Sequence, residues 1–176
     1  MQSIPHSGVR RARRGIQVFE VLLLFPVLLI ATLSFFVLGP TVTVRQNVQH
    51  AAEEAAREIA KKTGTQTTTI IATDVVNEVI SVHSLSLATP GVRVDVWEYD
   101  DVGNTVIQTP LGDLGVLPAP ADPVGFNDPD QVIVQVTIEV DSTPIPNVLS
   151  NMKFDVSGRY LVHRATAFRD SYLPTP

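Results

Sequence analysis

The stretch RRARRGIQVFEVLLLFP, residues 10–26, joins four arginines and one glycine to an apolar run that carries a single acid. That acid, Glu20, is the only charged residue from Ile16 to Val44. A charge at membrane depth costs several kcal/mol, so such a residue pairs with a partner or marks a functional site. The stretch therefore predicts an N-terminal membrane helix in which Glu20 has a function.

The apolar run is long enough to cross a bilayer. Residues 21–38 carry no charge, and together with residues 16–19 they match a helix that spans a hydrocarbon core of roughly 30 Å. The four arginines precede this run, whereas only Arg45 follows it closely. Because basic residues stay on the cytoplasmic side, we expect a single-pass protein with a cytoplasmic N-terminus and an exported C-terminal domain.

The same residues admit a simpler interpretation, an uncleaved signal anchor. Residues 38–41, LGPT, lack the small-residue pattern of a secretory cleavage site. In an uncleaved anchor Gly15 has no role, and Glu20 lies near the cytoplasmic interface, where its carboxylate reaches water at low cost. This alternative stays open from the sequence.

Length and composition limit what the rest of the chain can be. The 176 residues leave room for one modest domain after the apolar segment. Of the 13 basic residues, four precede Gly15; without them 9 remain against 18 acidic residues, a formal charge of −9 that argues against nucleic-acid binding. The chain has no cysteine, which excludes disulfides and thiolate metal sites.

A helical pattern resumes at residue 40. Small apolar residues recur every three or four positions along one stripe, and charged residues occupy most other positions. Glu53 and Arg57 have the i,i+4 spacing of a stabilising ion pair. Glu58 and Lys62 have the same spacing. The stripe consists of Val44, Val48, Ala51, Ala52, Ala55, Ala56, Ile59 and Ala60.

If Gly39 and Pro40 only bend the chain, one helix runs from about Ile16 to Lys62 and is about 70 Å long. Pro26 and Pro40 are its predicted kinks, since proline removes a helical hydrogen bond. The small-residue stripe either seats the globular domain or packs between subunits. The sequence does not separate these two uses.

The segments that follow are predicted to form first a helix and then strands. A threonine within residues 67–69 can cap a second helix that runs to about Ser84. Residues 92–97 alternate apolar and polar side chains, which predicts a half-buried strand. Residues 101–104 then form the turn of a hairpin whose second strand is 105–108.

The C-terminal part combines a long loop with two strands. Residues 110–130 contain five prolines and show no periodicity, which predicts a loop. Residues 131–140 have an apolar β-branched residue at every second position and form the strongest strand. A last strand is expected from about Asp155 to Phe168, with Gly158 at a bulge. Two helices followed by consecutive strands indicate an α+β fold, with an antiparallel sheet packed on a helix.

Residues that commonly carry catalysis or bind transition metals are scattered. His50, His83 and His163 fall on three different predicted elements, without the spacing of a metal site. The sequence contains no phosphate-binding loop, nucleophile elbow or recognisable pairing of histidine and acid near a serine. We therefore expect no enzyme activity and no cofactor.

Acidic residues in and near the proline-rich loop are weak candidates for a calcium site. Asp122, Asp128 and Asp130, together with Asp113, offer oxygen ligands, but their spacing matches no defined calcium loop. Solvated turn residues are the simpler interpretation.

The N-terminal residues resemble those of type IV pilins and pseudopilins. A basic leader ends in Gly15, an acid follows at the fifth position, and an apolar helix continues from there. Within this class the chain is similar to TadE-like minor pseudopilins of the tight adherence (Tad) pilus. The similarity includes Pro26, the Ala-rich extension with Gln46 and Gln49, and a Val-rich strand that leads through a Pro/Leu turn to a last strand. Val21 departs from the pattern, because Tad pilins usually have tyrosine after the acid.

The resemblance implies that prepilin peptidase cuts between Gly15 and Ile16 and leaves a new α-amino group on Ile16. This amine can pair with Glu20 of a neighbouring subunit in a filament core, where each charge offsets the desolvation of the other and fixes axial register. The implied partners are prepilin peptidase, other pilins or pseudopilins, the inner-membrane assembly platform and the lipid bilayer. The implied location is the bacterial inner membrane, with the C-terminal domain periplasmic or extracellular.

Under this interpretation the chain has four parts. They are a leader at 1–15, a membrane or filament-core helix at 16–39, an amphipathic extension at 40–63, and an exported α+β domain at 64–176 that contains the loop 110–130. The rival class is an uncleaved, membrane-anchored domain that binds a ligand through that loop. Cleavage after Gly15 separates the two classes.

Overall fold

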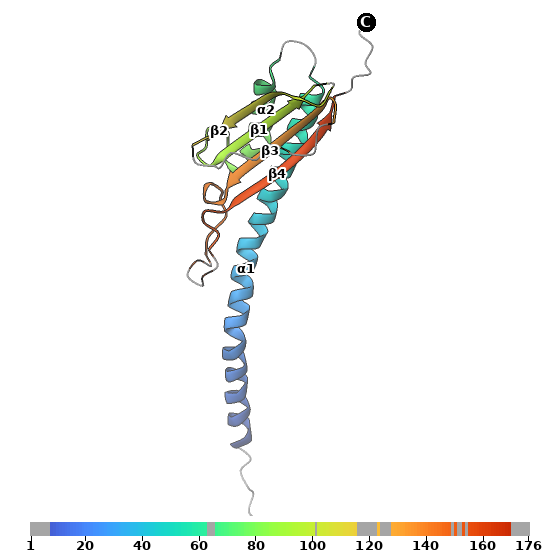
Figure 1. The fold of residues 1–176 in the computed structure, drawn as a ribbon. Helices are drawn as coiled ribbons and strands as arrows, with labels where there is room; N and C mark the ends of the chain where they lie inside the picture. The colour runs from blue at the N-terminus through green and yellow to red at the C-terminus, as the bar shows by residue number, and fades with distance from the viewer. Residues whose placement is uncertain are drawn as a thin grey trace, which may run out of the picture.

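The computed structural model confirms the α+β class: a long N-terminal helix, a second helix and a four-stranded antiparallel sheet (Figure 1). It describes residues 8–62, 66–100, 102–115, 123, 128–148, 150, 153 and 155–169, with side chains from residue 18 on except that of Val106. The helices are α1 (Gly8–Ala60) and α2 (Thr68–Ile80), and the 3-10 turn η1 (Ser81–His83) follows α2. The strands are β1 (Val92–Tyr99), β2 (Thr105–Gly112), β3 (Gln131–Glu139) and β4 (Tyr160–Phe168), with the 3-10 turn η2 (Val140–Ser142) after β3.

α1 is one continuous helix of 53 residues, which makes it about 80 Å long at 1.5 Å per residue. It runs through Pro26 and Pro40, although each proline removes one main-chain hydrogen bond. The expected single helix from Ile16 is therefore present, and it extends back to Gly8. Kinks at the two prolines stay a prediction.

The small-residue stripe of α1 is the side that the sheet covers. The strand order is β2-β1-β3-β4, every neighbouring pair is antiparallel, and α1 packs against β3, β4 and α2. Seven stripe residues are at most 1% exposed, and Ala60 is half-buried. These seven are Val44, Val48, Ala51, Ala52, Ala55, Ala56 and Ile59. The stripe therefore seats the domain within one chain.

α2 forms as predicted, because its N-terminus is capped and one face is apolar. Thr67 is the cap, and its Oγ1 accepts a hydrogen bond from the Ile70 N–H at 3.4 Å. The helix buries Ile71, Ala72, Val76 and Ile80 and packs on α1. η1 is followed by Ser84, whose φ of 59° is left-handed and stops the helical path.

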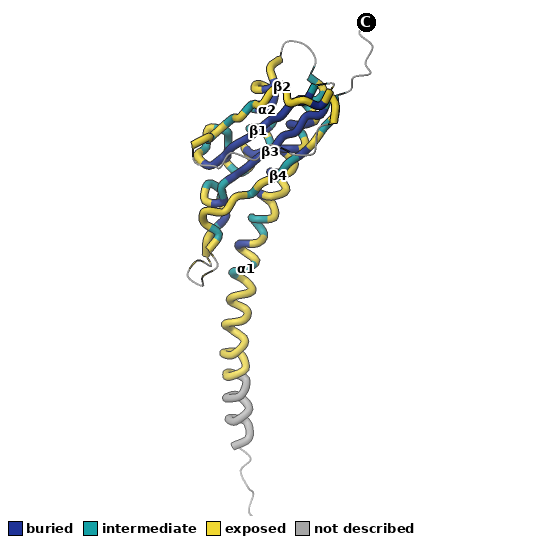
Figure 2. Tube along the Cα trace, viewed as in Figure 1, coloured by how far each residue is buried: buried dark blue, intermediate teal, exposed yellow. Residues whose placement is uncertain are grey.

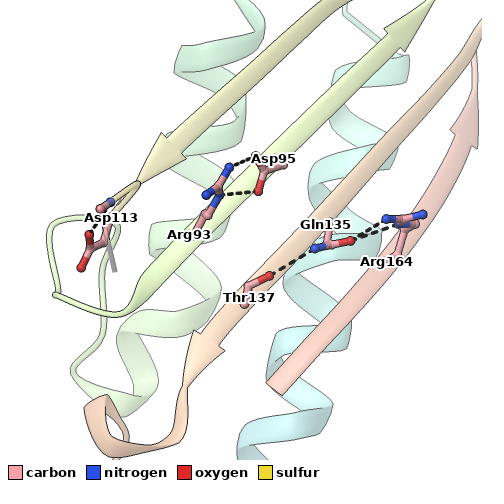
Figure 3. A network of polar contacts seen from close by, with 7 residues as sticks. Arg93, Asp95, Asp113, Gln135, Thr137 and Arg164 are labelled. Carbon is pink, nitrogen blue, oxygen red and sulfur yellow. Dashed lines mark hydrogen bonds and ion pairs between the residues drawn. The ribbon is translucent and has the colours of Figure 1, made fainter. Parts of the chain in front are cut away.

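β1 is buried on both faces, whereas its alternating pattern predicted burial on one. Val92, Val94 and Val96 belong to the core that contains the α1 stripe. On the other face the guanidinium of Arg93 donates to the Asp95 carboxylate through Nε at 2.8 Å and Nη2 at 2.9 Å (Figure 3). Because the guanidinium and the carboxylate hydrogen-bond to each other, both charges can be buried on this face without contact with water.

Polar contacts continue across the same face on β3 and β4 (Figure 3). Gln135 accepts a hydrogen bond from Nη2 of Arg164 at 2.7 Å and donates to Oγ1 of Thr137 at 3.3 Å. The Arg164 guanidinium also lies 5.4 Å from the centroid of the Trp97 ring, a cation–π distance. The polar residues at every second position of these strands thus interact with one another on this face of the sheet.

β2 extends farther than predicted, to Gly112, and so includes Pro110 from the start of the expected loop. Gly112 has a φ of +84°, and a Cβ there would lie 2.3 Å from the carbonyl oxygen of Val92. Only glycine fits this close approach of two strands.

β4 begins at Tyr160, later than the predicted start near Asp155. The Asp155 carboxylate accepts a hydrogen bond from the Ser157 N–H at 2.9 Å, and this side-chain turn keeps the chain out of the ladder. Gly158 lies in the turn with a φ of +65°, and the register of β3 with β4 is continuous. The expected bulge at Gly158 is therefore wrong.

The ion pairs on α1 differ from those predicted. Arg57 pairs with Glu54 at 3.3 Å, and Lys61 pairs with Glu58 at 2.7 Å. Both are i,i+3 contacts in place of the expected i,i+4 pairs. The two spacings bring side chains equally close on a helix surface, so the choice between them has little energetic weight.

Candidate functional site

The N-terminal half of α1 projects from the domain without cover (Figures 1 and 2). Large apolar side chains are exposed all around it from Val18 to Ile30. Its 18-residue window of mean hydropathy 2.8 is only 6% buried. Among the described residues, α1 is the one helix long and apolar enough to cross a membrane, a criterion that a signal sequence also meets.

Glu20 lies in this uncovered half. Its neighbours Phe19 and Val21 are 79% and 67% exposed, and Glu20 is exposed as well. Among the side chains that the structure describes, Glu20 has no hydrogen-bond or ion-pair partner. An unpaired carboxylate on an apolar helix needs either water or a cation from another molecule.

Gly15 and Ile16 lie on the same helix as Glu20, and only their backbone is described. The bond between them falls inside continuous helix. Glycine weakens a helix interior by about 1 kcal/mol relative to alanine, so Gly15 lowers the cost of local opening at this bond.

The two prolines fall in different surroundings. Pro26 is exposed within the uncovered half, whereas Pro40 is half-buried where the domain begins to cover α1. Val37 is 7% exposed and is the first buried residue along α1, and the half-buried Leu33 before it packs against the same core. The boundary between the two halves of α1 thus lies at residues 33–37.

The weak calcium candidates are not brought together by any described contact. Asp122 lies outside the described residues, and Asp128 is exposed. Asp113 accepts hydrogen bonds from the N–H groups of Gly91 and Gly115, as a turn residue does. Over the described part of the chain, Asp130 included, no group of three or more His, Asp or Glu side chains is placed to hold a metal ion.

His50, His83 and His163 lie in separate surroundings. Nε2 of His83 lies 2.8 Å from Nδ2 of Asn47. His50 lines a groove of about 660 Å³ between α1 and α2, and His163 lines a hollow beside β4. The three do not combine into one site.

A buried acid on β1 was missed from the sequence. Glu98 is 2% exposed and accepts hydrogen bonds from Oγ1 of Thr68 and Nη2 of Arg169. Lys62 donates to the same threonine hydroxyl at 3.1 Å. Partners 30 and 71 residues away leave no local signal in the sequence. This cluster connects the start of α2 to the end of β4.

Comparison with family models, with curated proteins and with solved structures gave no match to this chain. The architecture therefore has to be judged from its own geometry. A long apolar N-terminal helix, half of it free and half of it seated on an antiparallel four-stranded sheet, is a pilin-like architecture.

Proposed function

We propose that the chain is a minor pseudopilin, a structural and non-enzymatic subunit of a Tad or type IV-like pilus assembly machine. The observation that carries the proposal is the division of α1. One half is covered by the chain's own sheet, while the other exposes large apolar residues and a single acid. A subunit that must leave a bilayer and enter a helical filament core needs both halves.

Glu20 is the proposed docking group. In the membrane or filament core, an exposed carboxylate would cost several kcal/mol unless a cation meets it. Cleavage after Gly15 creates that cation as the α-ammonium group of Ile16. Pairing of one subunit's Glu20 with a neighbour's Ile16 amine offsets the desolvation of both and selects one axial register.

The leader supplies the remaining elements of the proposal. The four arginines before Gly15 hold the cleavage point at the cytoplasmic face of the inner membrane. Prepilin peptidase is the partner that removes them, and other pilins, the assembly platform and the bilayer are the later partners. The sheet domain is then exported to the periplasmic or extracellular side.

The substitution Glu20→Leu tests the docking role. We expect normal cleavage and membrane insertion but loss of incorporation into pili, measured by immunoblotting of sheared pilus fractions from the native host. Glu78→Leu is the matched control, since Glu78 is an exposed acid on α2, away from the uncovered half of α1. Unchanged incorporation of the Glu20→Leu protein would contradict the docking role.

A second candidate function is an uncleaved, membrane-anchored extracytoplasmic binding domain. The observation that favours it is the continuity of α1 from Gly8 through Gly15 and Ile16, as an intact anchor would have. In that case Glu20 sits near the cytoplasmic interface and contacts water. Mass analysis of the membrane-extracted protein separates the candidates, because only the pseudopilin begins at Ile16.

A further inference from the structure

The segment between β3 and β4, here called the β3–β4 connection, lies at the end of the sheet from which α1 leaves the domain. β3 ends at Glu139 and β4 begins at Tyr160, and the segment between them extends past the sheet in the direction of the uncovered half of α1 (Figure 1). The opposite end of the sheet carries the β1–β2 hairpin, where the Asp130 N–H donates to the Asp100 carbonyl at 3.0 Å. The described residues of the connection are 140–148, 150, 153 and 155–159.

The connection packs where the uncovered half of α1 ends. Ile145 is 8% exposed and belongs to the buried core that contains Val37. Leu33 and Val156 are half-buried and pack against this core. The connection therefore reaches the boundary between the two halves of α1.

This boundary coincides with the outer end of a membrane span. A helix needs about 20 residues to cross a hydrocarbon core of roughly 30 Å. Counted from Ile16, which follows the basic leader, that length ends close to Val37, and the next charged residue is Arg45. If α1 spans a bilayer, the β3–β4 connection is held at the level of the outer headgroups.

The connection presents side chains that suit a headgroup layer. Val148 is 43% exposed, and Pro144 is exposed as well. Lys153 is exposed on the same connection, and its long side chain lets the ammonium group stay in water while the methylene groups contact apolar surface. Apolar groups beside a basic residue are typical of segments that lie in the membrane interface.

The acids of the connection accept hydrogen bonds from the connection itself. The Asp141 carboxylate accepts from the Gly158 N–H at 3.0 Å, and the Asp155 carboxylate accepts from the Asn147 amide at 2.7 Å. These bonds close the connection on itself and hold in place Val148, which follows Asn147. Because both carboxylates have polar partners, neither depends on water alone.

Main-chain donors at residues 143–146 are satisfied without water. The Thr143 N–H donates to the Val140 carbonyl at 3.0 Å, and the Ile145 N–H donates to Oγ1 of Thr143 at 3.4 Å. Pro144 and Pro146 have no N–H. A segment beside lipid has to satisfy such groups internally, because hydrocarbon offers no partner.

We propose that the β3–β4 connection is a membrane-contact surface, on which Val148 enters the headgroup layer of the outer leaflet while α1 spans the bilayer. The partner is the phospholipid surface itself. The inference rests on a membrane-spanning α1, which both candidate functions share, and adds a second contact that sets the height and tilt of the domain above the bilayer.

Fluorescence quenching by labelled lipids tests the proposal in the full chain. The sequence has no cysteine, so Val148→Cys provides a single site for a fluorophore. The labelled protein is reconstituted in phosphatidylcholine vesicles that contain a lipid with a nitroxide on its headgroup. We expect the label at residue 148 to lose most of its fluorescence to this quencher.

Two further labels provide the controls. Val102→Cys is the matched control, because Val102 is 74% exposed in the hairpin at the opposite end of the sheet. Its label should keep its fluorescence in the presence of the headgroup nitroxide. Leu24→Cys, in the uncovered half of α1, reports the span and should be quenched by a nitroxide at the end of the acyl chain. The three positions separate failure of the contact from failure of the span.

Three results would overturn the proposal. Quenching at residue 24, with no more quenching at residue 148 than at residue 102, would remove the contact and leave the span. Absence of quenching at residue 24 would remove the span, and with it both candidate functions and this inference. Energy transfer between residue-148 labels on different copies that persists on dilution with excess lipid would show that a second copy covers this surface.

Discussion

The two halves of α1 are equally helical and mostly apolar, yet they meet different surroundings. From Val37 to Ile59 the helix presents valines, alanines and one isoleucine to the sheet, and those residues are buried. From Val18 to Ile30 it presents leucines, phenylalanines and other large side chains to no part of the described chain. Small residues mark the half that the chain covers itself, because they let a sheet approach the helix closely.

Along α1, the side chains that the domain buries are mostly small and the exposed ones are large, so burial on this helix does not follow hydrophobicity alone. The uncovered half is the more apolar of the two, so its exposure would be unstable in water. Its length and composition are those of a membrane span or of a signal sequence. The predictions below test whether the two halves are independent, from the largest expected effect to the smallest.

Removal of residues 1–30 should give the largest effect, a change from membrane-bound to soluble protein. The packed part of α1 begins with Leu33 and Val37, so the remaining chain should keep its fold. Fractionation measures the change in location, and the near-ultraviolet circular dichroism of the buried Trp97 reports the fold. If the truncated chain were unfolded, the two halves of α1 would not be independent, since the uncovered half would then contribute to domain stability.

The next largest effect is a difference in the free energy of unfolding between variants of two acids, one in the domain and one in the uncovered half of α1. Asp95 is fully buried and paired with Arg93, so Asp95→Asn should lower the free energy of unfolding by about 3 kcal/mol. Glu20→Gln should leave that free energy unchanged, because Glu20 contacts nothing in the domain. Urea unfolding followed by Trp97 fluorescence measures both variants. Equal changes in the free energy of unfolding for the two variants would contradict the division of α1 into a covered and an uncovered half.

An Ala→Leu substitution made once in each half of α1 should give a smaller difference in domain stability. Ala52 is 0% exposed, so Ala52→Leu should destabilise the domain by about 1–3 kcal/mol through overpacking against the sheet. Ala31→Leu makes the same change at an exposed position and should leave domain stability unaltered. Thermal unfolding in one detergent compares the two variants, and a destabilised Ala31→Leu protein would show that the uncovered half packs on the domain.

The smallest expected effect concerns pH and the turn before β4. Hydrogen bonds from the Ser157 N–H, the Asn147 amide and the Ser157 hydroxyl lower the pKa of Asp155 to about 2, from 3.8. Its stabilising effect is therefore complete above pH 3.8 and is lost as the pH falls toward 2. Asp155→Asn should flatten the acid limb of the stability curve within that window, measured by urea unfolding at each pH. An unchanged acid limb would mean that the turn forms without the carboxylate.

Much of the fold follows from local patterns in the sequence. The stripe from Val44 to Ile59 predicted the seated face of α1, and the alternation in residues 131–140 predicted β3. Local patterns failed at two places on β1. Its second face is buried because Arg93 and Asp95, only two residues apart, pair with each other, and alternation of apolar and polar residues does not show such a pair. Glu98 depends on a distant residue at the end of β4.

The candidate residue Glu20 stands out in the sequence for a different reason. Glu20 is a charged residue within an apolar run, and such a residue can be recognised from the sequence without a structure. Its partner is not visible in one chain, because the proposed amine belongs to a neighbour.

The most direct test of the account is the N-terminal residue of the protein extracted from membranes of its native host. The division of α1, together with a Glu20 that has no partner among the described side chains, predicts a mature chain that begins at Ile16, with the four leader arginines removed. Mass spectrometry of the intact protein and N-terminal sequencing both give this answer. A chain that still begins at Met1 would contradict the pseudopilin account and leave the uncleaved anchor.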